Sequence, residues 1–207
     1  MATSSKVSIR LTNENLWKEF NSFTTEMIVT KNGRRTINTL FCCKLNLNCR
    51  FRFANGEWLP SGCADPRDPP KALSHHDGAQ LGKTWMRSPI CFDRVKLTNC
   101  QTDASQKLHS MHKYRPRLLV YRLQHPSPFA VFSLLNSDMT LVASYSNPIT
   151  DFVAVTAYQN QKTIKLKIKY NPFAKGFREG NERKRHSGTR GTILKDSETA
   201  TSNVYFE

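Results

Sequence analysis

Hydrophobic and polar residues follow two different periods along this chain. Residues 13–23, NENLWKEFNSF, carry large apolar side chains at helical spacing, which predicts one core-facing helix with Asn13 as its cap. From Met27 onward, short runs rich in β-branched and aromatic residues are separated by Gly, Pro, Asn and Asp, which predicts strands. The runs are EMIVT (26–30), TLFCCKL (39–45), RFRFA (50–54), RLLVYRL (117–123), FAVFSLL (129–135), DFVAVTAY (151–158) and TIKLKIKY (163–170). This order predicts a mainly antiparallel β-sandwich or barrel.

The end of this pattern predicts a lysine-bearing strand followed by a short helix. In TIKLKIKY, Ile, Leu and Ile alternate with lysines, so a strand would carry a row of ammonium groups on one face. Asn171 and Pro172 then favour an extended entry and a helix start. Phe173 and Phe177 lie four residues apart on that helix. Two interpretations stay open: the rings pack on the domain's own core, or they form an apolar wedge that enters a DNA minor groove.

Composition narrows the class of partner. The chain has 207 residues, enough for one large domain with tails, and its 31 Lys and Arg against 16 Asp and Glu give 31 − 16 = +15. Polyanions are the natural partners of such a surface. We find no long apolar run, no basic amphipathic helix and no signal peptide, so we expect no membrane association, and nucleic acid is favoured. We also expect no small-molecule substrate.

The domain boundaries follow from composition. We predict a disordered N-terminus at residues 1–6, a single folded domain at 7–180, and a basic, polar tail at 181–207, most of which should be disordered because it is poor in large apolar residues. The tail contains the basic cluster Arg183, Lys184 and Arg185. The cluster fits a nuclear-import signal or a loose contact to the DNA backbone, and the sequence does not choose between them.

The residues that usually carry chemistry are not arranged for it. The six cysteines lack a C-x2-C pair, and His109 and His112 are three apart without a cysteine pair at zinc-finger spacing, so we expect reduced thiols and no metal. The best reactive cluster, His75-His76-Asp77, lies in a segment that reads as a surface loop. No nucleophile motif or Gly-rich phosphate loop is present. We therefore expect neither an enzyme nor a cofactor.

Cations at turns are more informative. In TKNGRR (30–35) the Asn-Gly turn is followed at once by Arg34 and Arg35. They fit a solvated hairpin tip, or one guanidinium on a guanine edge while the other grips phosphate. The segments RVKLTN (94–99) and HKYRPR (112–117) also place cations beside hydroxyls and amides, as phosphate contacts do.

Read in order, several segments resemble the signature blocks of the T-box DNA-binding domain of the Brachyury family. They are LWKEF (16–20), EMIVTKNGRR (26–35), NGEWLPSG (55–62), WMRSPICFDRVKLTN (85–99), LHSMHKYRPRLLVYRL (108–123) and FVAVTAYQNQKTIKLKIKYNPFAKGF (152–177). The resemblance covers residues 7 to 178. It implies an immunoglobulin-like β-sandwich with a short N-terminal helix and a C-terminal DNA-contacting helix. It also implies a nuclear, developmental transcription regulator of RNA polymerase II genes that binds double-stranded DNA with a GGTGTGA-type core. Whether a second copy joins it on palindromic sites stays open.

The resemblance also implies roles for individual residues. Arg34 would read a guanine in the major groove, and Arg35 and Lys96 would hold phosphates. Lys167 and Asn171 would fix the C-terminal helix against the DNA backbone. The minor-groove contacts would come from Phe173, Ala174, Gly176, Phe177 and Arg178. For Tyr158, Gln159 and Asn160, which match the family's YQN, contacts to DNA and loop-stabilising hydrogen bonds are both open.

The chain departs from the family pattern in three places. Between Arg35 and Asn55 a passage with a GLDP turn and an LDF strand is missing, which leaves a shorter sheet, an exposed edge or a rearranged pairing around residues 42–53. After YQN the usual Ile-Thr order is reversed to Thr163-Ile164, which puts a phosphate contact by that threonine in doubt. The segment KALSHHDGAQLGKTW (71–85) differs from the sequence that is commoner in the family, which indicates a divergent member.

Two other classes are weaker. A single-strand nucleic-acid module would use aromatic rings as stacking platforms, but the chain lacks an RNP-type strand. An extracellular immunoglobulin-like adhesion domain would need a signal peptide and paired cysteines.

Overall fold

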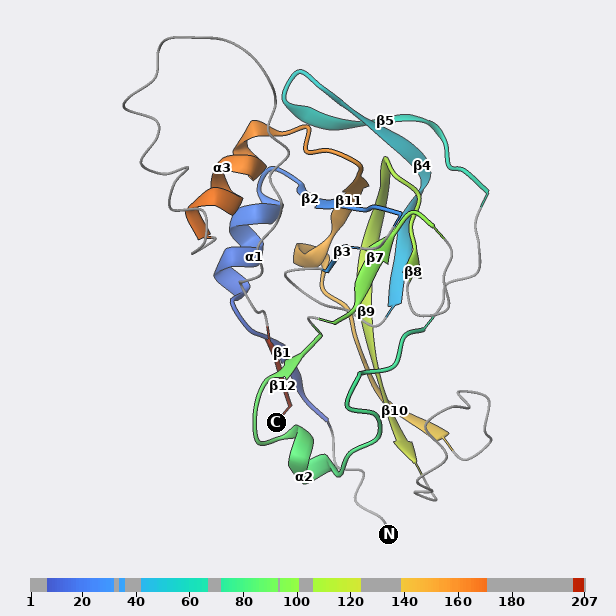
Figure 1. Ribbon diagram of the computed structural model, residues 1–207, viewed down its shortest axis with the longest axis vertical. Coiled ribbons are helices and arrows are strands. Elements are labelled where there is room, and N and C mark those ends of the chain that lie inside the picture. The colour runs from blue at the N-terminus through green and yellow to red at the C-terminus, as the bar shows by residue number, and fades with distance from the viewer. Residues whose placement is uncertain are drawn as a thin grey trace.

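The computed structural model describes residues 7–31, 34–35, 42–66, 72–92, 94–100, 106–123, 139–170 and 203–206 (Figure 1). Strands dominate this part of the chain, and two of the three α-helices lie side by side. The elements are β1 (Ile9–Leu11), α1 (Glu14–Asn21), β2 (Thr25–Ile28), β3 (Arg34–Arg35), β4 (Cys42–Ala54), β5 (Glu57–Cys63), α2 (Gly82–Trp85), β6 (Ile90–Cys91), β7 (Lys96–Thr98), β8 (Gln106–Lys107), β9 (His112–Leu123), β10 (Met139–Tyr145), the 3-10 helix η2 (Pro148–Thr150), β11 (Phe152–Val155), α3 (Gln161–Tyr170) and β12 (Asn203–Phe206).

The described strands form one large sheet and two small ones. The large sheet has the order β2-β11-β9-β4-β5, with β10 also paired to β9. The small sheets are β3-β7-β8 and β1-β12-β6. β11 pairs in parallel with β2 and antiparallel with β9, whereas the other pairings of the large sheet are antiparallel. The sheet is therefore mainly antiparallel, as the pattern of short strands predicts.

β9 connects the two halves of the core. Its burial alternates, with His112, Tyr114, Pro116 and Leu118 buried on one face, as expected for a strand with one apolar side. Tyr114 packs in a cluster with residues of β2, β7 and β11, and Leu118 packs with Ile90 of β6. One face of the large sheet thus packs against both small sheets. This arrangement confirms the predicted mainly β, immunoglobulin-like sandwich.

The helix predicted near the N-terminus is α1. Trp17 and Phe20 are buried on its inner face, at 1% and 7% exposure. Asn13 occupies the N-cap position, but its backbone is left-handed (φ 53°) and its side chain makes no capping hydrogen bond. The position of the cap is therefore right, and the predicted capping bond is absent.

The region from which a strand is missing is one long strand. β4 pairs with β9 from Cys42, opposite Arg117, to Arg50, opposite His112. From Cys49 to Ala54 its other edge pairs with β5. Of the three alternatives, a rearranged pairing fits this arrangement: residues 42–45 pair with β9, residues 49–54 pair with β5, and the two pairings meet near Arg50. The predicted strands at 39–45 and 50–54 contribute to one element, and residues 36–41 lie outside the described residues.

The predicted strand at residues 163–170 is wrong, because Gln161–Tyr170 form the helix α3. The Asn160 side chain accepts a hydrogen bond from the amide of Lys162 (2.9 Å), which is an N-cap, and the Ile164 amide donates to the Asn160 carbonyl. Thr163 and Leu166, three residues apart, are buried. A helical cap and a helical burial period therefore override the local alternation.

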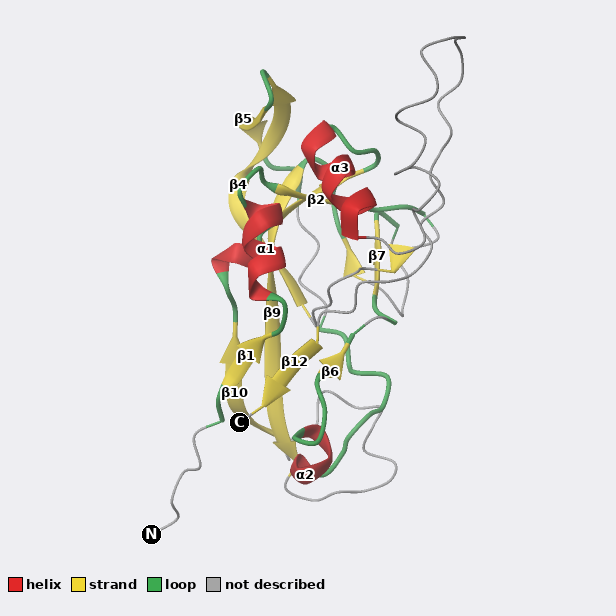
Figure 2. Cartoon of the chain, turned by 90° about the vertical axis from the view of Figure 1, so that its left-hand side faces the viewer, coloured by secondary structure: helices red, strands yellow, loops and turns green. Residues whose placement is uncertain are grey.

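Three other predicted elements are only partly described. Residues 129–135 and the helix predicted from Pro172 lie outside the described residues. In the tail predicted to be disordered, residues 203–206 form β12, which pairs antiparallel with β1 and β6 (Figure 2). The rest of the tail lies outside the described residues. Within the described residues no helix is long and apolar enough to cross a membrane.

Candidate nucleic-acid interface

The two arginines of the TKNGRR turn lie beside a third predicted contact residue. β3 pairs antiparallel with β7, with Arg34 opposite Leu97 and Arg35 opposite Lys96. Directly opposed residues of an antiparallel pair share a face of the sheet. Lys96 is exposed, and its neighbour Leu97 is buried at 3% exposure. Arg35 and the exposed Lys96 are therefore directly opposed in the β3–β7 ladder, although they are far apart in the sequence.

The loop that leads to these arginines is held by Thr98. Its hydroxyl donates to the carbonyl of Thr30 (2.7 Å) and to that of Lys31 (3.1 Å), and it accepts a hydrogen bond from the Cys100 amide (3.0 Å). Thr98 is buried at 1% exposure. The hydroxyl in RVKLTN is thus fully used inside the domain. It fixes the strand that carries Lys96 to the start of the arginine turn.

α3 presents lysines on two different faces. Lys162, Lys165 and Lys169 are exposed on the outer side of the helix. Lys167 is half-buried, and its ammonium donates to the Tyr158 hydroxyl (2.6 Å) and lies 4.7 Å from the centre of that ring. A strand would have placed lysines 165, 167 and 169 together. The helix instead separates Lys167 from the exposed lysines and brings Lys162 to them.

α3 is also tied to α1. The Tyr170 hydroxyl donates to the Glu19 carboxylate (2.6 Å), and the Lys169 ammonium lies 3.3 Å from the same carboxylate. The hydrogen bond from Tyr170, with help from Lys169, lowers the pKa of Glu19. In Figures 1 and 2 the two helices run next to each other on one side of the sandwich. The last residue of α3 is therefore attached to the N-terminal helix.

Glu26 on β2 is a buried carboxylate that connects three segments. It has no exposed surface and accepts three N–H hydrogen bonds: from the Trp58 indole (3.0 Å) and from the backbone amides of Gln159 and Asn160 (2.9 Å each). Burial raises the pKa of Glu26, while these three hydrogen bonds and the nearby Lys167 ammonium oppose that rise. Glu26 therefore joins β2 and β5 to the start of α3.

Comparisons with known proteins show the family of this chain. The T-box family model matches residues 9–46 and 39–179, which together cover most of the chain. The chain belongs to the T-box family. The two matched segments overlap at residues 39–46, beside the place where the sequence lacks the family's usual strand.

Individual T-box relatives are similar over most of this chain. It is 46% identical to T-box transcription factor tbx-8 of Caenorhabditis elegans over 87% of this chain and 63% of that protein. It is 39% identical to human T-box transcription factor TBX6 over 96% of this chain and 48% of that protein, and 37% identical to T-box transcription factor T of Xenopus laevis over 87% and 43%. The chain thus spans less than two thirds of these relatives.

The YQN segment of this T-box domain stabilises its own loop. Asn160 is buried, and its side-chain amide donates to the carbonyl of Phe23 (3.2 Å) while its oxygen caps α3. The Tyr158 hydroxyl is engaged by Lys167, and Gln159 offers its backbone amide to Glu26. Of the two interpretations left open, internal hydrogen bonding is the one observed.

The HKYRPR segment is also mostly engaged inside the domain. Arg115 makes two hydrogen bonds to Asp151 (2.6 and 2.9 Å), which raise the pKa of its guanidinium. Arg117 donates to the Ser144 hydroxyl (2.9 Å), and Lys113 lies 5.9 Å from the centre of the Phe51 ring. These cations stabilise the sandwich, and the interface is better sought at β3, β7 and α3.

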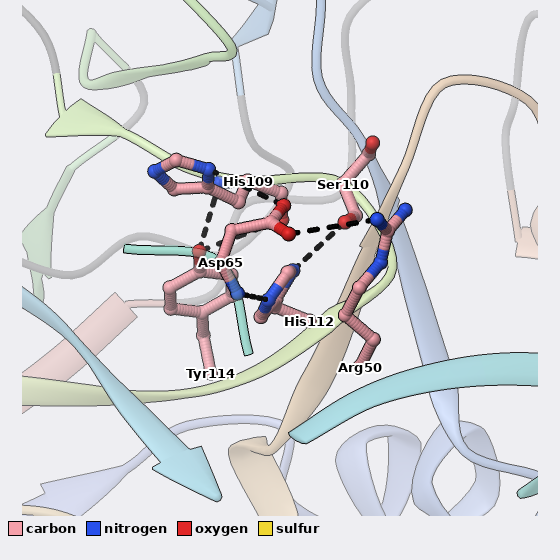
Figure 3. A network of polar contacts seen from close by, with 6 residues as sticks. All are labelled: Arg50, Asp65, His109, Ser110, His112 and Tyr114. Atoms are coloured by element: carbon pink, nitrogen blue, oxygen red, sulfur yellow. Dashed lines mark hydrogen bonds and ion pairs between the residues drawn. The ribbon is translucent and has the colours of Figure 1, made fainter. Parts of the chain in front are cut away.

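His112 in HSMH has both ring nitrogens in hydrogen bonds (Figure 3). Nε2 accepts from the Asp65 amide (3.0 Å), so the ring proton is on Nδ1, which donates to the Ser110 carbonyl (2.9 Å). Figure 3 also shows Asp65 between Arg50 (3.5 Å) and His109 (3.7 Å). The cluster joins the segment after β5 to the start of β9, and His112 offers no nitrogen to a metal.

The His75-His76-Asp77 cluster is likewise a structural feature. Its donor atoms lie within 4.8 Å of one another. His75, however, accepts from the Asp77 amide at Nδ1 (3.1 Å) and donates from Nε2 to the Cys91 carbonyl (2.8 Å). Its ring also packs edge-on against Trp85 and Phe92. Because both nitrogens are used, His75 is a loop anchor. The expected surface loop has a half-buried histidine at its base.

Several predicted contact residues fall beyond the description. Asn171, Phe173, Ala174, Gly176, Phe177 and Arg178 lie outside the described residues, as does the basic cluster at 183–185. Thr163, whose position departs from the family order, is fully buried in α3 and therefore cannot reach a phosphate.

Sequence reasoning missed Glu26 and Lys162. Glu26 begins the run EMIVT, where a polar residue in a strand normally reads as solvent-facing. The signal that marks its role, three N–H donors, comes from β5 and from the loop before α3. The strand interpretation begins at residue 163 and therefore does not include Lys162.

Proposed function

We propose that this T-box domain binds double-stranded DNA sequence-specifically and belongs to a nuclear transcription factor of RNA polymerase II genes. Its target would be a T-box element with a GGTGTGA-type core. The relatives named above are transcription factors, and the charge of +15 favours a polyanion. The proposal rests above all on the pairing that sets Arg35 beside the exposed Lys96 on β3 and β7.

In this proposal the β3–β7 ladder, at the end that carries the arginine turn, meets the major groove. Arg34 reads a guanine edge, while Arg35 and Lys96 hold phosphates. Thr98 supports this arrangement because it fixes the backbone of Thr30 and Lys31 beside β7. The exposed lysines of α3 add phosphate contacts, and Lys167 with Asn171 orients the helix near the DNA backbone.

Phe173 and Phe177 are proposed to enter the minor groove, where Ala174 and Gly176 allow close approach and Arg178 adds charge. α3 leads directly to this segment and is held at both ends, by Glu26 through Asn160 and by Glu19 through Tyr170. A fixed helix immediately before the wedge supports this role, because a wedge must be presented at a defined angle.

The decisive experiment titrates a labelled duplex carrying GGTGTGA and a scrambled duplex at several salt concentrations. We expect tighter binding to the GGTGTGA duplex, with the logarithm of affinity falling by about 0.9 per phosphate contact for each unit of log salt. Equal affinity for both duplexes at every salt would refute specificity. An unstructured oligonucleotide that competes equally would favour single-strand binding.

Two substitutions distinguish a residue that reads a base from a residue that holds a phosphate. Arg34→Ala should cost about 1–3 kcal/mol and relax specificity at one base, whereas Lys96→Ala should weaken all sequences alike. Lys83→Ala on α2, also at an exposed lysine, is the matched control and should leave binding unchanged. If Lys83→Ala weakened binding as much as Lys96→Ala, the β3–β7 ladder would have no special role.

The wedge is tested separately with Phe177→Ala. If the ring meets DNA, affinity falls and the melting temperature stays the same; if the ring packs in the core, the melting temperature falls. Light scattering of the complex on single and palindromic sites then shows whether one copy or two are bound.

A further inference from the structure

Two cysteines face each other across the β4–β5 hairpin. Cys49 on β4 is the direct cross-strand partner of Cys63 on β5. Both are free thiols; Cys63 is exposed and Cys49 is half-buried. Among the strand pairings of the described residues, this is the pair in which cysteine lies opposite cysteine. The sequence alone does not reveal it, because residues 49 and 63 have no metal-site or redox-motif spacing.

The backbone geometry of this pair is compatible with a disulfide. Directly opposed residues of antiparallel strands have Cα atoms about 4.5 or 5.5 Å apart, depending on the type of pair. Disulfides span Cα separations of about 4.4–6.8 Å, so either type of pair lies within the range. The cysteines also share one face of the hairpin, because opposed residues do. No movement of one strand past the other is needed.

The position of the pair in the hairpin adds local freedom. Cys63 is the last residue of β5, and the ladder is irregular between Cys49 and Phe51. A strand end beside a bulge tolerates the small adjustment that an S–S bond requires better than the middle of a regular ladder does. Two residues later, the Asp65 amide donates to His112, which holds this end of the hairpin near β9.

We propose that Cys49 and Cys63 are a redox modification site that forms a reversible intramolecular disulfide with a peroxide-class oxidant. The exposed Cys63 loses its proton, and the thiolate attacks one peroxide oxygen; the S–O bond forms, the O–O bond breaks, and the hydroxide that leaves takes up the thiol proton to give water, so that the sulfur is oxidised by two electrons to a sulfenic acid. The Cys49 thiolate then attacks that sulfur; the S–S bond forms, the S–O bond breaks, and hydroxide leaves and takes up a proton. In sum, two thiols and one hydrogen peroxide give one disulfide and two waters.

The cross-link has a structural consequence. It ties the open end of the β4–β5 hairpin, whose other contacts include Trp58 with Glu26 and Asp65 with His112. A closed loop restricts the unfolded chain and therefore favours the folded state. We expect the oxidised domain to melt at a higher temperature than the reduced one. In a reducing compartment both residues stay thiols, and this inference does not depend on DNA binding.

The test oxidises the reduced, folded chain with hydrogen peroxide, blocks free thiols with iodoacetamide, and maps tryptic peptides. Cys49 and Cys63 fall on separate peptides, residues 45–50 and 53–67, which are distinct from those of the other four cysteines. The expected product is these two peptides joined, with the mass of two hydrogen atoms lost. Dithiothreitol should restore both free peptides and reverse the rise in melting temperature.

Control variants separate the pair from general thiol oxidation. Cys100→Ser removes another exposed thiol and should leave the joined peptide intact. Cys63→Ser and Cys49→Ser should each abolish it, while the reduced variants melt like the reduced parent. The proposal is overturned if both cysteines remain separately alkylated after oxidation, or if the joined peptides involve other cysteines.

Discussion

The Glu26 carboxylate on β2 accepts a hydrogen bond from the backbone amide of Asn160, 2.9 Å away and 134 residues further along the chain. Asn160 in turn caps α3 through its side chain. A buried acid thus fixes the start of the helix that leads to the proposed minor-groove segment. Because the same carboxylate also accepts from the Trp58 indole, the β4–β5 hairpin is attached to this point as well.

Replacing this carboxylate should destabilise the domain. In Glu26→Gln, one acceptor oxygen becomes an NH2 group that faces an N–H donor of Trp58, Gln159 or Asn160. A buried donor left without an acceptor costs about 1–3 kcal/mol, so the free energy of unfolding should fall by that amount. Urea denaturation measures it, with Glu57→Gln, at an exposed acid of β5, as control. Equal stability of the Glu26→Gln variant and the parent would contradict the role of Glu26.

The buried carboxyl also gives a pH dependence of known sign. Burial raises the pKa of Glu26 above its ordinary value near 4.5, so the folded domain holds this proton more tightly than the unfolded chain does. Its contribution to the free energy of unfolding is therefore largest at low pH and is lost as pH rises from the ordinary value through the raised one. Glu19, whose pKa is lowered, acts in the opposite direction. The difference in unfolding free energy between the parent and Glu26→Gln isolates Glu26, and it should shrink as pH rises. A difference that grows with pH would show that the sign is wrong.

Lysines on the two faces of α3 should behave differently when they are replaced. Lys165→Ala removes an exposed charge, so affinity for every duplex should fall and the salt slope should decrease by about 0.9, with unchanged stability. Lys167→Met removes the donor to the Tyr158 hydroxyl and should lower the free energy of unfolding by about 1 kcal/mol. Binding titrations and urea melts of both variants make the comparison. If Lys167→Met changes only the salt slope, Lys167 is a phosphate contact and not a brace.

The local pattern of apolar residues is sufficient to predict a helix or strand where burial of that element's apolar residues determines its structure. The apolar periods predict the positions of α1, β2, β9 and β11. Trp17 lies on the buried face of α1 and Tyr114 on the buried face of β9, whereas Phe152 belongs to β11, which is buried at every residue. α3 was mispredicted because Ile164, Leu166 and Ile168 alternate as they would in a strand. Tertiary contacts at its first turn, which a local window does not contain, stabilise the helix instead.

The sequence predicts which types of residue make up the candidate site, but it does not predict how they are arranged in space. The sequence indicates that Arg35 and Lys96 are cations beside turns, but only the pairing of β3 with β7 shows that they are neighbours. Conversely, Arg115 and Thr98 also lie in segments that the sequence marks as possible phosphate contacts, yet each forms hydrogen bonds to partners inside the domain. Whether a cation is free for DNA depends on partners many residues away, and that information is absent from a short motif.

Thr98 should affect DNA binding without touching DNA. Thr98→Val keeps the shape of the side chain but removes the donor to the Thr30 and Lys31 carbonyls and the acceptor for the Cys100 amide. Buried groups that lose their partners cost about 1–3 kcal/mol, so stability should fall. Hydrogen exchange at Thr30 and Lys31 should quicken, and affinity for the GGTGTGA duplex should fall as the turn before Arg34 loosens. Thr84→Val, at an exposed threonine on α2, is the matched control. If Thr98→Val binds DNA as tightly as the parent while exchange quickens, the arginine turn does not need this anchor, and the β3–β7 ladder is not the major-groove reader proposed here.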